Sequence, residues 1–458
     1  MNNVTKYVGE EDLPVMNGAR YSAVKLLSRY ERSDSYIDKL LDHELSHAEL
    51  NQPDKSLLTE IVNGTIRWRG RLDWILNGFY RGDYQKCLNI VKNSMRVALY
   101  QILFLNKIPV ASAVDEAVEI VKRIQGEKTA NIVNGVLRNI ARNIPNIRYP
   151  DKEEDVVYYL SVIYSHPKWM VKRWLERYGE EFTEKLLFAN TNRPYIPLRI
   201  NSMKTDRDTV AEALNKMNII YYTTPYFYDA LLLKNPNQNI FSSELFQNGF
   251  ATVQDPSAAL AARLAQPQEG MTVIDLCAAP GGKSFYLAEM MHDKGTVIAL
   301  EKYRSKLRFI EEGASRIGLN SIKTLTDDAR TYMPENPADI VFADVPCSGL
   351  GTLSKKPDIK WKKDTEDVQK IAVLQREIME NAARTIKVGG IFIYSTCTIE
   401  YEENQENVEW FLGAHPEFEL DPAENYLNKD VCLDGYYQVF PNIHEIDGAF
   451  AARFVKRS

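Results

Sequence analysis

The sequence predicts three consecutive domains: an all-helical domain over residues 1–145, a small α+β domain over 146–250 and an α/β domain over 251–458. Three observations lead to this division. Before residue 145, apolar residues recur at intervals of three and four, which is the period of an amphipathic helix. Between 146 and 250, helical stretches are followed by short apolar runs. After 250, short apolar runs alternate with helical segments, which is typical of a doubly wound parallel sheet.

The first domain shows helical periods alone. Pro109 and Gly126 separate its periodic segments, and Asn143 and Pro145 mark its end. Its predicted helices cover residues 20–30, 56–76, 91–105 and 114–124. The second domain is mixed, with predicted helices at 167–179, 180–191 and 206–218 and predicted strands at 196–201, 219–224 and 230–234.

The third domain alternates the two kinds of element. Its predicted strands cover 271–278, 296–301, 322–328, 338–345 and 389–396, and its predicted helices cover 281–293, 303–318 and 368–386. Ligands of doubly wound sheets bind beyond the carboxyl ends of the strands. Polar or reactive residues stand at four of these ends, namely Asp275–Cys277, Glu301, Asp344–Cys347 and Thr396–Cys397. Four such ends together predict a functional site.

Composition excludes several classes of protein. We expect no membrane span, because no uninterrupted apolar run of about 18 residues is present, and the first twenty residues lack the features of a signal peptide. The five cysteines are widely spread without a C-x-x-C pair, so we expect reduced thiols in a cytoplasm and no metal site. The net charge is −6, but residues 61–145 carry 13 Lys+Arg against 6 Asp+Glu, whereas residues 398–450 carry 1 against 13. The basic N-terminal region is a candidate nucleic-acid surface or simply a solvated face.

The turn "DLCAAPGGKS" at residues 275–284 indicates a nucleoside ligand without a phosphate. It lacks the first glycine of a phosphate-cradling loop, since that position is Cys277, and it lacks the three spaced glycines of the dinucleotide fingerprint. Glu301, at the end of the next strand, is placed to accept from ribose hydroxyls, and Asp328 is a candidate for an adenine amino group. S-adenosylmethionine is a ligand of this kind. The alternative is a glycine turn that serves helix packing.

Three motifs resemble those of the RNA cytosine-5 methyltransferases. "DLCAAPGGKS" is similar to the family's cofactor loop, "DVPCSGLGTLSKKPDIKW" (344–361) to its Asp-x-Pro-Cys-Ser-Gly segment, and "YSTCTIEYEENQENV" (394–408) to its Thr-Cys segment. The ending "DGAFAARFVK" (447–456) looks like its closing strand, and "VDEAVEIVKR" and "NIVNGVLRNI" resemble the antitermination factor NusB. Such a fusion is typical of the bacterial 16S ribosomal RNA cytosine-5 methyltransferases. Glu301 departs from the family's more usual Asp, and residues 151–250 match only loosely.

The resemblance implies a fold, a cofactor and a set of site residues. The third domain would be a Rossmann-like methyltransferase domain that uses S-adenosylmethionine, behind a NusB-like RNA-binding domain. The implied catalytic residues are Cys397, Cys347, Asp344 and Lys283. The implied cofactor-binding residues are Cys277, Ala278, Ala279, Pro280, Gly281, Gly282, Lys283, Glu301, Asp328 and Asp344. The implied partner is RNA, as 16S rRNA or a small-subunit precursor, with no membrane and no metal, and we expect a monomer.

The spacing does not decide which cysteine attacks the base. C5 of cytosine is a poor nucleophile until a thiolate adds to C6, so covalent catalysis by a cysteine is expected. DNA cytosine-5 methyltransferases use the Cys of a Pro-Cys pair, which would be Cys347. The RNA family uses the Thr-Cys segment, which points to Cys397 and leaves Cys347 to assist product release. Asp344 could bind the N3–N4 edge of the base, and we interpret Cys87 and Cys432 as packing residues.

Two basic stretches are candidate RNA contacts. "TIRWRGRLDW" (65–74) places Arg67, Arg69 and Arg71 beside two tryptophans, and "LSKKPDIKWKK" (353–363) contains five lysines and Trp361. For the first stretch, helical core tryptophans with solvated arginines are an equal alternative. Two other functions compete with RNA methylation: an RNA-binding or antitermination factor with an inactive methyltransferase domain, and methylation of DNA or protein.

Overall fold

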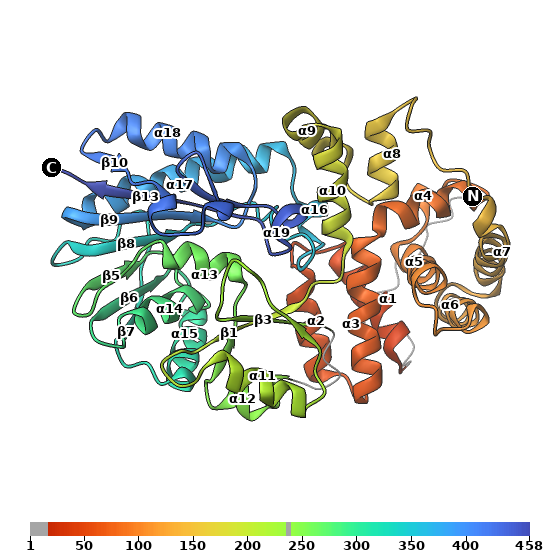
Figure 1. Ribbon diagram of the computed structural model, residues 1–458. Coiled ribbons are helices and arrows are strands. Elements are labelled where there is room, and N and C mark those ends of the chain that lie inside the picture. The colour runs from red at the N-terminus through yellow and green to blue at the C-terminus, as the bar shows by residue number, and fades with distance from the viewer. Residues whose placement is uncertain (1–16, 235–239) are drawn as a thin grey trace. The chain divides into compact units, whose positions relative to one another are not determined.

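The computed structural model describes residues 17–234 and 240–458. The chain folds into two compact units, which are described separately (Figure 1). The first unit comprises residues up to Thr191 together with a short later segment, Lys356–Lys362. The second comprises Asn192–Lys355 and Lys363–Ser458. Among the described residues, no helix combines the length and apolar character that a bilayer crossing needs.

The first unit is helical, as predicted. Its helices are α1 (Ala19–Tyr30), α2 (Ile37–His47), α3 (Gln52–Arg67), α4 (Arg69–Phe79), α5 (Asn89–Phe104), α6 (Val110–Gln125), α7 (Glu127–Asn143), α8 (Val156–Ile163), α9 (Lys168–Tyr178) and α10 (Glu180–Thr191). The apolar faces of α1 to α7 bury one core that includes Leu27, Ile61, Leu99 and Leu137. The helical period therefore predicted this core correctly.

Two features of this unit differ from the prediction. The continuous helix expected over 56–76 is split at Trp68, whose ψ of 9° leaves the helical range and whose ring stacks on Phe104 at 4.7 Å. Helices α8 to α10, which the sequence placed in the middle domain, group with the first unit. The Trp74 indole N–H donates to Tyr158 Oη at 2.8 Å, which ties α8 to α4.

The second unit contains two sheets. The smaller has the order β2-β3-β1-β4 and comprises β1 (Ile196–Ile200), β2 (Tyr221–Tyr222), β3 (Ala230–Leu233) and β4 (Ala251–Val253), with α11 (Arg207–Lys216) and the single turn α12 (Glu244–Gln247) beside it. Strand β2 is shorter than the predicted 219–224, because it lies at the edge and pairs with β3 alone. Strand β4 pairs with β1, so this sheet extends beyond residue 250.

The larger sheet carries the strand ends that the sequence singled out. Its order is β11-β12-β13-β9-β8-β5-β6-β7, with β10 paired to β13. The strands are β5 (Thr272–Asp275), β6 (Thr296–Glu301), β7 (Ile322–Thr326), β8 (Ala338–Asp344), β9 (Ile386–Thr396), β10 (Phe418–Leu420), β11 (Cys432–Leu433), β12 (Tyr436–Val439) and β13 (Ala449–Lys456). Strands β5 to β9 pair in parallel, as predicted, whereas β10 to β13 add antiparallel pairs, most of which the apolar runs did not reveal.

Helices cover both faces of this sheet (Figure 1). On one face α13 (Pro256–Arg263), α14 (Gly282–Met290) and α15 (Arg304–Ile317) bury Leu260, Leu287 and Ile310 against it. On the other face α17 (Thr365–Thr385) and α18 (Gln405–Ala414) bury Met379 and Phe411. This arrangement confirms the doubly wound α/β fold and leaves the carboxyl ends of β5, β6, β8 and β9 at one edge.

Candidate active site

Strand pairing brings the two cysteine motifs together. Strand β8 lies between β5 and β9, and in the parallel register with β9 Asp344 pairs with Ser395. Ser395 Oγ donates to Asp344 Oδ1 at 3.2 Å, and Val345 N–H donates to the Ser395 carbonyl at 3.0 Å. Two motifs some fifty residues apart in sequence therefore become neighbours because both follow adjacent parallel strands.

The two thiols of these motifs are in direct contact. Cys347 Sγ lies 3.1 Å from Cys397 Sγ, and the Cys397 N–H donates to Cys347 Sγ at 3.4 Å. None of the five cysteines of the chain forms a disulfide. The hydrogen bond with Cys397, burial and the negative charge of Cys397 raise the pKa of Cys347 well above its usual value. The raised pKa favours the thiol form of Cys347.

An ion pair stands at the same strand edge. Lys283 Nζ, from the first turn of α14, lies 2.6 Å from Asp344 Oδ2 at the end of β8. Burial lowers the pKa of Lys283, but the charge of Asp344, their hydrogen bond and the charge of Cys397 more than offset that effect, and the pKa is raised. A negative charge on the Cys397 sulfur therefore favours the charged form of Lys283.

A buried polar scaffold, which the sequence did not identify, holds both cysteine segments. Glu403 Oε2 accepts from Ser348 N–H at 2.8 Å, next to Cys347, and from Gln375 Nε2 at 2.9 Å. Gln375 Nε2 also donates to the Pro346 carbonyl at 2.9 Å. On the other segment, Thr396 Oγ1 donates to Asn404 Oδ1 at 2.6 Å. In the sequence, only the run of glutamates and asparagines after Cys397 pointed to these residues, and it did not predict which groups they would contact.

The glycine turn before α14 is shaped by a close contact. Gly281 has a φ of 112°, and a Cβ atom there would lie 2.4 Å from the Phe285 ring, so only glycine fits. Asp275 accepts from Ser284 Oγ at 2.6 Å and from Cys277 N–H at 3.3 Å, which fixes both ends of the turn. Burial raises the pKa of Asp275 to about 6, opposed by the Ser284 hydrogen bond and assisted by the charge of Asp344. Because the Cys277 N–H donates to Asp275, it is engaged within the protein.

The carboxylates that follow β6 and β7 fit a nucleoside. Glu301 is 7% exposed, and both of its contacts, with Tyr303 N–H at 3.0 Å and Lys306 Nζ at 3.4 Å, use Oε1. Within the described residues, Oε2 has no hydrogen-bond partner and can accept from a hydroxyl. Asp328 is held by Arg330 at 2.8 Å and Lys302 at 3.0 Å, and the Arg330 hydrogen bond above all lowers its pKa. Oε2 of Glu301 therefore suits a ribose hydroxyl and disfavours phosphate, as S-adenosylmethionine requires, whereas both oxygens of Asp328 are already engaged by Arg330 and Lys302.

The lysine-rich stretch after Cys347 does not offer the surface that the sequence suggested. Lys355 forms ion pairs with Asp255 and, at 2.8 Å, with Asp447. Lys360 is 1% exposed and donates to the Arg67 carbonyl at 2.9 Å. Lys362 donates to the Ser33 carbonyl at 3.0 Å. Lys356, by contrast, is exposed. The prediction of five RNA-facing lysines is wrong for Lys355 and Lys360, because buried carboxylates and carbonyls use their N–H groups.

The arginines of the first basic stretch are also engaged within the first unit. Arg67 is 5% exposed. Arg71 donates to Tyr149 Oη at 2.7 Å and lies 4.7 Å from the centroid of that ring. Trp68 and Trp74 pack against the helical core. The alternative of core tryptophans is therefore confirmed for Trp68 and Trp74, but its solvated arginines are wrong for Arg67 and Arg71, which are buried or engaged within the unit. In the described part of the chain, no group of three or more His, Cys, Asp and Glu side chains forms a metal-binding cluster.

The sheet order, the glycine turn and the carboxylate after β6 define the class: a Rossmann-like, S-adenosylmethionine-dependent methyltransferase. The family model described as 16S rRNA methyltransferase RsmB/F matches residues 262–455, a NusB family model matches 17–142, and a ferredoxin-like domain model of RsmF/B-like methyltransferases matches 166–240. The chain belongs to this RsmB/F methyltransferase family.

Relatives and solved structures agree with this assignment. The chain is 38% identical to a probable ribosomal RNA small subunit methyltransferase B of Bacillus subtilis, over 95% of this chain and 98% of that protein. It is 30% identical to a ribosomal RNA small subunit methyltransferase B of Klebsiella pneumoniae, over 89% and 92%. The crystal structure of PH0851 superposes with a TM-score of 0.80 at 26% identity, over 97% of this chain and 100% of that one.

Proposed function

We propose that this protein methylates C5 of a cytosine in 16S ribosomal RNA through a covalent bond between Cys397 and C6 of the base. The observation that carries the proposal is the pair of thiols 3.1 Å apart at the same strand edge as the Lys283–Asp344 ion pair. A non-catalytic RNA-binding protein has no need of two adjacent thiols beside a buried cation. The names of the relatives support ribosomal RNA as the substrate.

The reaction follows from the arrangement of the thiols. The Cys397 thiolate adds to C6, the new C–S bond uses the sulfur electron pair, and the C5–C6 π electrons make C5 nucleophilic. S-adenosylmethionine, when bound, would supply the methyl group: C5 would bond to the methyl carbon, and the electrons of the broken S–CH3 bond would leave on the sulfur of S-adenosylhomocysteine. A base then takes the proton from C5, the electrons of that C–H bond restore the C5–C6 double bond, and the C6–S bond breaks to return the Cys397 thiolate.

The neighbouring residues divide the remaining tasks. Lys283 stabilises negative charge on Cys397, and Asp344 binds the N3–N4 edge of the base while it holds Lys283. Cys347, kept as a thiol, donates a hydrogen bond to the Cys397 sulfur and assists its departure when the product forms. Residues 277–283, Glu301, Asp328 and Asp344 would hold the cofactor, with Glu301 on the ribose hydroxyls.

The target base must leave any duplex, because a stacked base cannot present C6 to a thiol. Residues 1–145 bind RNA in this proposal, residues 146–250 connect them to the rest of the chain, and residues 251–458 carry the chemistry. We expect the protein to act as a cytoplasmic monomer on the rRNA or on a small-subunit precursor.

Transfer of a labelled methyl group tests the proposal directly. The wild-type protein and Cys397→Ala are incubated with S-adenosylmethionine carrying a tritiated methyl group and with 16S rRNA, small ribosomal subunits, DNA or protein. We expect label only in RNA, as 5-methylcytidine after nuclease digestion, and none with Cys397→Ala. Cys432→Ala is the matched control, since that thiol lies outside the site, and it should transfer methyl at the wild-type rate. Label in another nucleoside, in DNA or in protein would refute the proposal.

A further inference from the structure

The first unit contains a polar pocket of about 630 Å³ that no part of the proposed reaction uses. It is lined by residues of the helices and by two residues of the segment Lys356–Lys362, which belongs to the same unit. Its volume falls within the range of about 300–1,000 Å³ that is usual for ligand sites. The residues that matter below are Glu31, Asp34, Tyr36, Arg69, Trp361 and Lys362.

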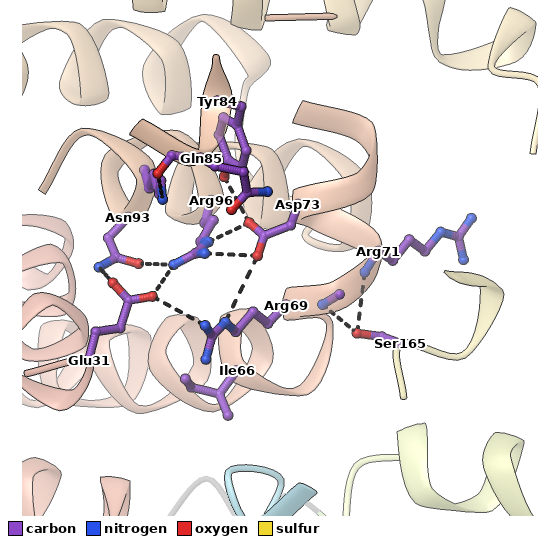
Figure 2. A network of polar contacts seen from close by, with 12 residues as sticks. Glu31, Ile66, Arg69, Arg71, Asp73, Tyr84, Gln85, Asn93, Arg96 and Ser165 are labelled. Carbon is purple, nitrogen blue, oxygen red and sulfur yellow. Dashed lines mark hydrogen bonds and ion pairs between the residues drawn. The ribbon is translucent and has the colours of Figure 1, made fainter. Parts of the chain in front are cut away.

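A saturated ion network forms one side of the pocket (Figure 2). Arg96 is bidentate to Asp73, at 2.6 and 2.8 Å, and also pairs with Glu31 at 2.5 Å. Tyr84 Oη donates to Asp73 at 2.7 Å. Arg96 therefore offsets one of the two negative charges of Glu31 and Asp73, and its hydrogen bonds make the network a rigid wall.

Arg69 is the second cation of this network and pairs with Glu31 at 3.7 Å and with Asp73 at 3.9 Å (Figure 2). Both distances exceed hydrogen-bond length, so among the described residues the N–H donors of its guanidinium make no hydrogen bond. A guanidinium has five N–H donors in a planar fork that suits phosphate oxygens. With 29% of its side chain exposed, Arg69 can donate to a ligand that enters the pocket.

Aromatic rings stand beside this cation. The Trp361 ring centroid lies 5.6 Å from the Arg69 guanidinium carbon, and the indole N–H donates to the Ile66 carbonyl at 2.8 Å, which fixes the ring. A Cβ atom on Gly70 would lie 2.9 Å from the Trp361 ring, so the glycine makes room for it. Tyr36 is 39% exposed, and its ring centroid lies 5.6 Å from Lys362 Nζ. An exposed aromatic face beside a cation, such as that of Tyr36, is a typical platform for an unpaired base, whereas Trp361 is partly buried against the helical core.

From this juxtaposition we propose that the pocket binds one unpaired nucleotide of the substrate RNA, with its phosphate on Arg69 and Lys362 and its base on Tyr36 or Trp361. This inference rests on the proposed function. The carboxylates of Glu31 and Asp34 line the same pocket, and the amino and imino groups of a base can donate to them.

Binding of a short single-stranded oligoribonucleotide of mixed sequence to the full chain, followed by fluorescence anisotropy, tests this pocket. We expect Kd to rise about tenfold for Arg69→Gln and for Tyr36→Ala, as is usual for loss of a phosphate or stacking contact. The slope of log Kd against log salt should fall by about 0.7 for Arg69→Gln and stay constant for Tyr36→Ala. Arg123→Gln is the matched control, since Arg123 is an exposed arginine of the same unit that pairs with Glu119; its Kd should stay within about twofold of wild type.

Ultraviolet cross-linking of the same RNA locates the nucleotide. The expected adduct is on the peptide that contains Tyr36 or Trp361, and Arg69→Gln should reduce its yield. Wild-type binding by both variants, or adducts only elsewhere, would overturn the pocket while methyl transfer to RNA by the wild type still upheld the proposed function. If the wild-type protein does not methylate RNA, the proposed function is refuted. The anisotropy data would then still decide whether the pocket binds RNA.

Discussion

Two buried lysines, Lys283 and Lys360, show how differently one residue type behaves in two regions of this chain. Lys283 lies 2.6 Å from Asp344, and its pKa is raised. Lys360 is 1% exposed, donates to a backbone carbonyl, and burial together with the charge of Arg67 lowers its pKa well below the usual value. Burial costs both ammonium groups free energy, and only a carboxylate partner offsets that cost.

This difference explains why the lysine-rich stretch was misjudged from sequence. A lysine in sequence suggests a solvated cation, yet in this stretch Lys360 is a buried donor with a lowered pKa, and Lys355 is held by two carboxylates. In the first unit, Arg69 pairs with Glu31 and Asp73 only at 3.7 and 3.9 Å, so its N–H donors remain available for hydrogen bonds. Charge at a site is therefore set by the partners that the fold supplies.

Removal of the Lys355 charge should have the largest effect. Lys355→Met leaves Asp255 and Asp447 buried without their shared cation, so we expect the free energy of unfolding of the second unit to fall by about 3–5 kcal/mol. Exposed Lys356 is the control, and Lys356→Met should change the free energy of unfolding by no more than about 0.5 kcal/mol. Chemical denaturation followed by circular dichroism measures both. Equal changes in the two variants would mean that the Lys355 pairs contribute nothing.

Loss of the other paired lysine should act on the reaction. Lys283→Met removes the cation beside Cys397, and we expect the rate of methyl transfer to fall by about 10²–10³, as for other fixed groups that stabilise charge during a reaction. Lys294→Met removes an exposed lysine that pairs with Glu269 and should keep the wild-type rate. A threefold change in rate corresponds to about 0.7 kcal/mol of activation free energy. If the rate of Lys283→Met stays within threefold of the wild-type rate, Lys283 has no role in the mechanism.

The lowered pKa of Lys360 should make the stability of the protein depend on pH. Because the pKa of Lys360 is lowered in the folded protein, the unfolded chain binds one more proton between that lowered value and about 10.4, so stability rises with pH across this window. We expect a contribution of up to about 1.4 kcal/mol per pH unit in the wild type that Lys360→Met lacks. Thermal unfolding of both proteins from neutral to alkaline pH measures it. Parallel pH profiles would show that Lys360 keeps an ordinary pKa.

Much of the larger sheet was visible in the sequence, because continuous apolar runs identify buried parallel strands and their ends identify the site edge. The antiparallel strands β10 to β12 were missed since they are short and lack a clear alternation. The proximity of Cys347 and Cys397 was implied by the neighbouring strand ends, but their contact depends on the register of β8 and β9. The scaffold around Glu403 and the pocket at Arg69 arise from residues far apart in sequence, so no local pattern could predict them.

The central claim is that Cys397 attacks the base and Cys347 serves its release. Denaturing gel electrophoresis tests it after wild type, Cys347→Ala and Cys397→Ala are each mixed with substrate RNA and S-adenosylmethionine. We predict that Cys347→Ala accumulates a slow-migrating protein–RNA adduct, because the bond forms and release is impaired, and that Cys397→Ala forms none. An adduct with Cys397→Ala and none with Cys347→Ala would contradict the account and make Cys347 the nucleophile.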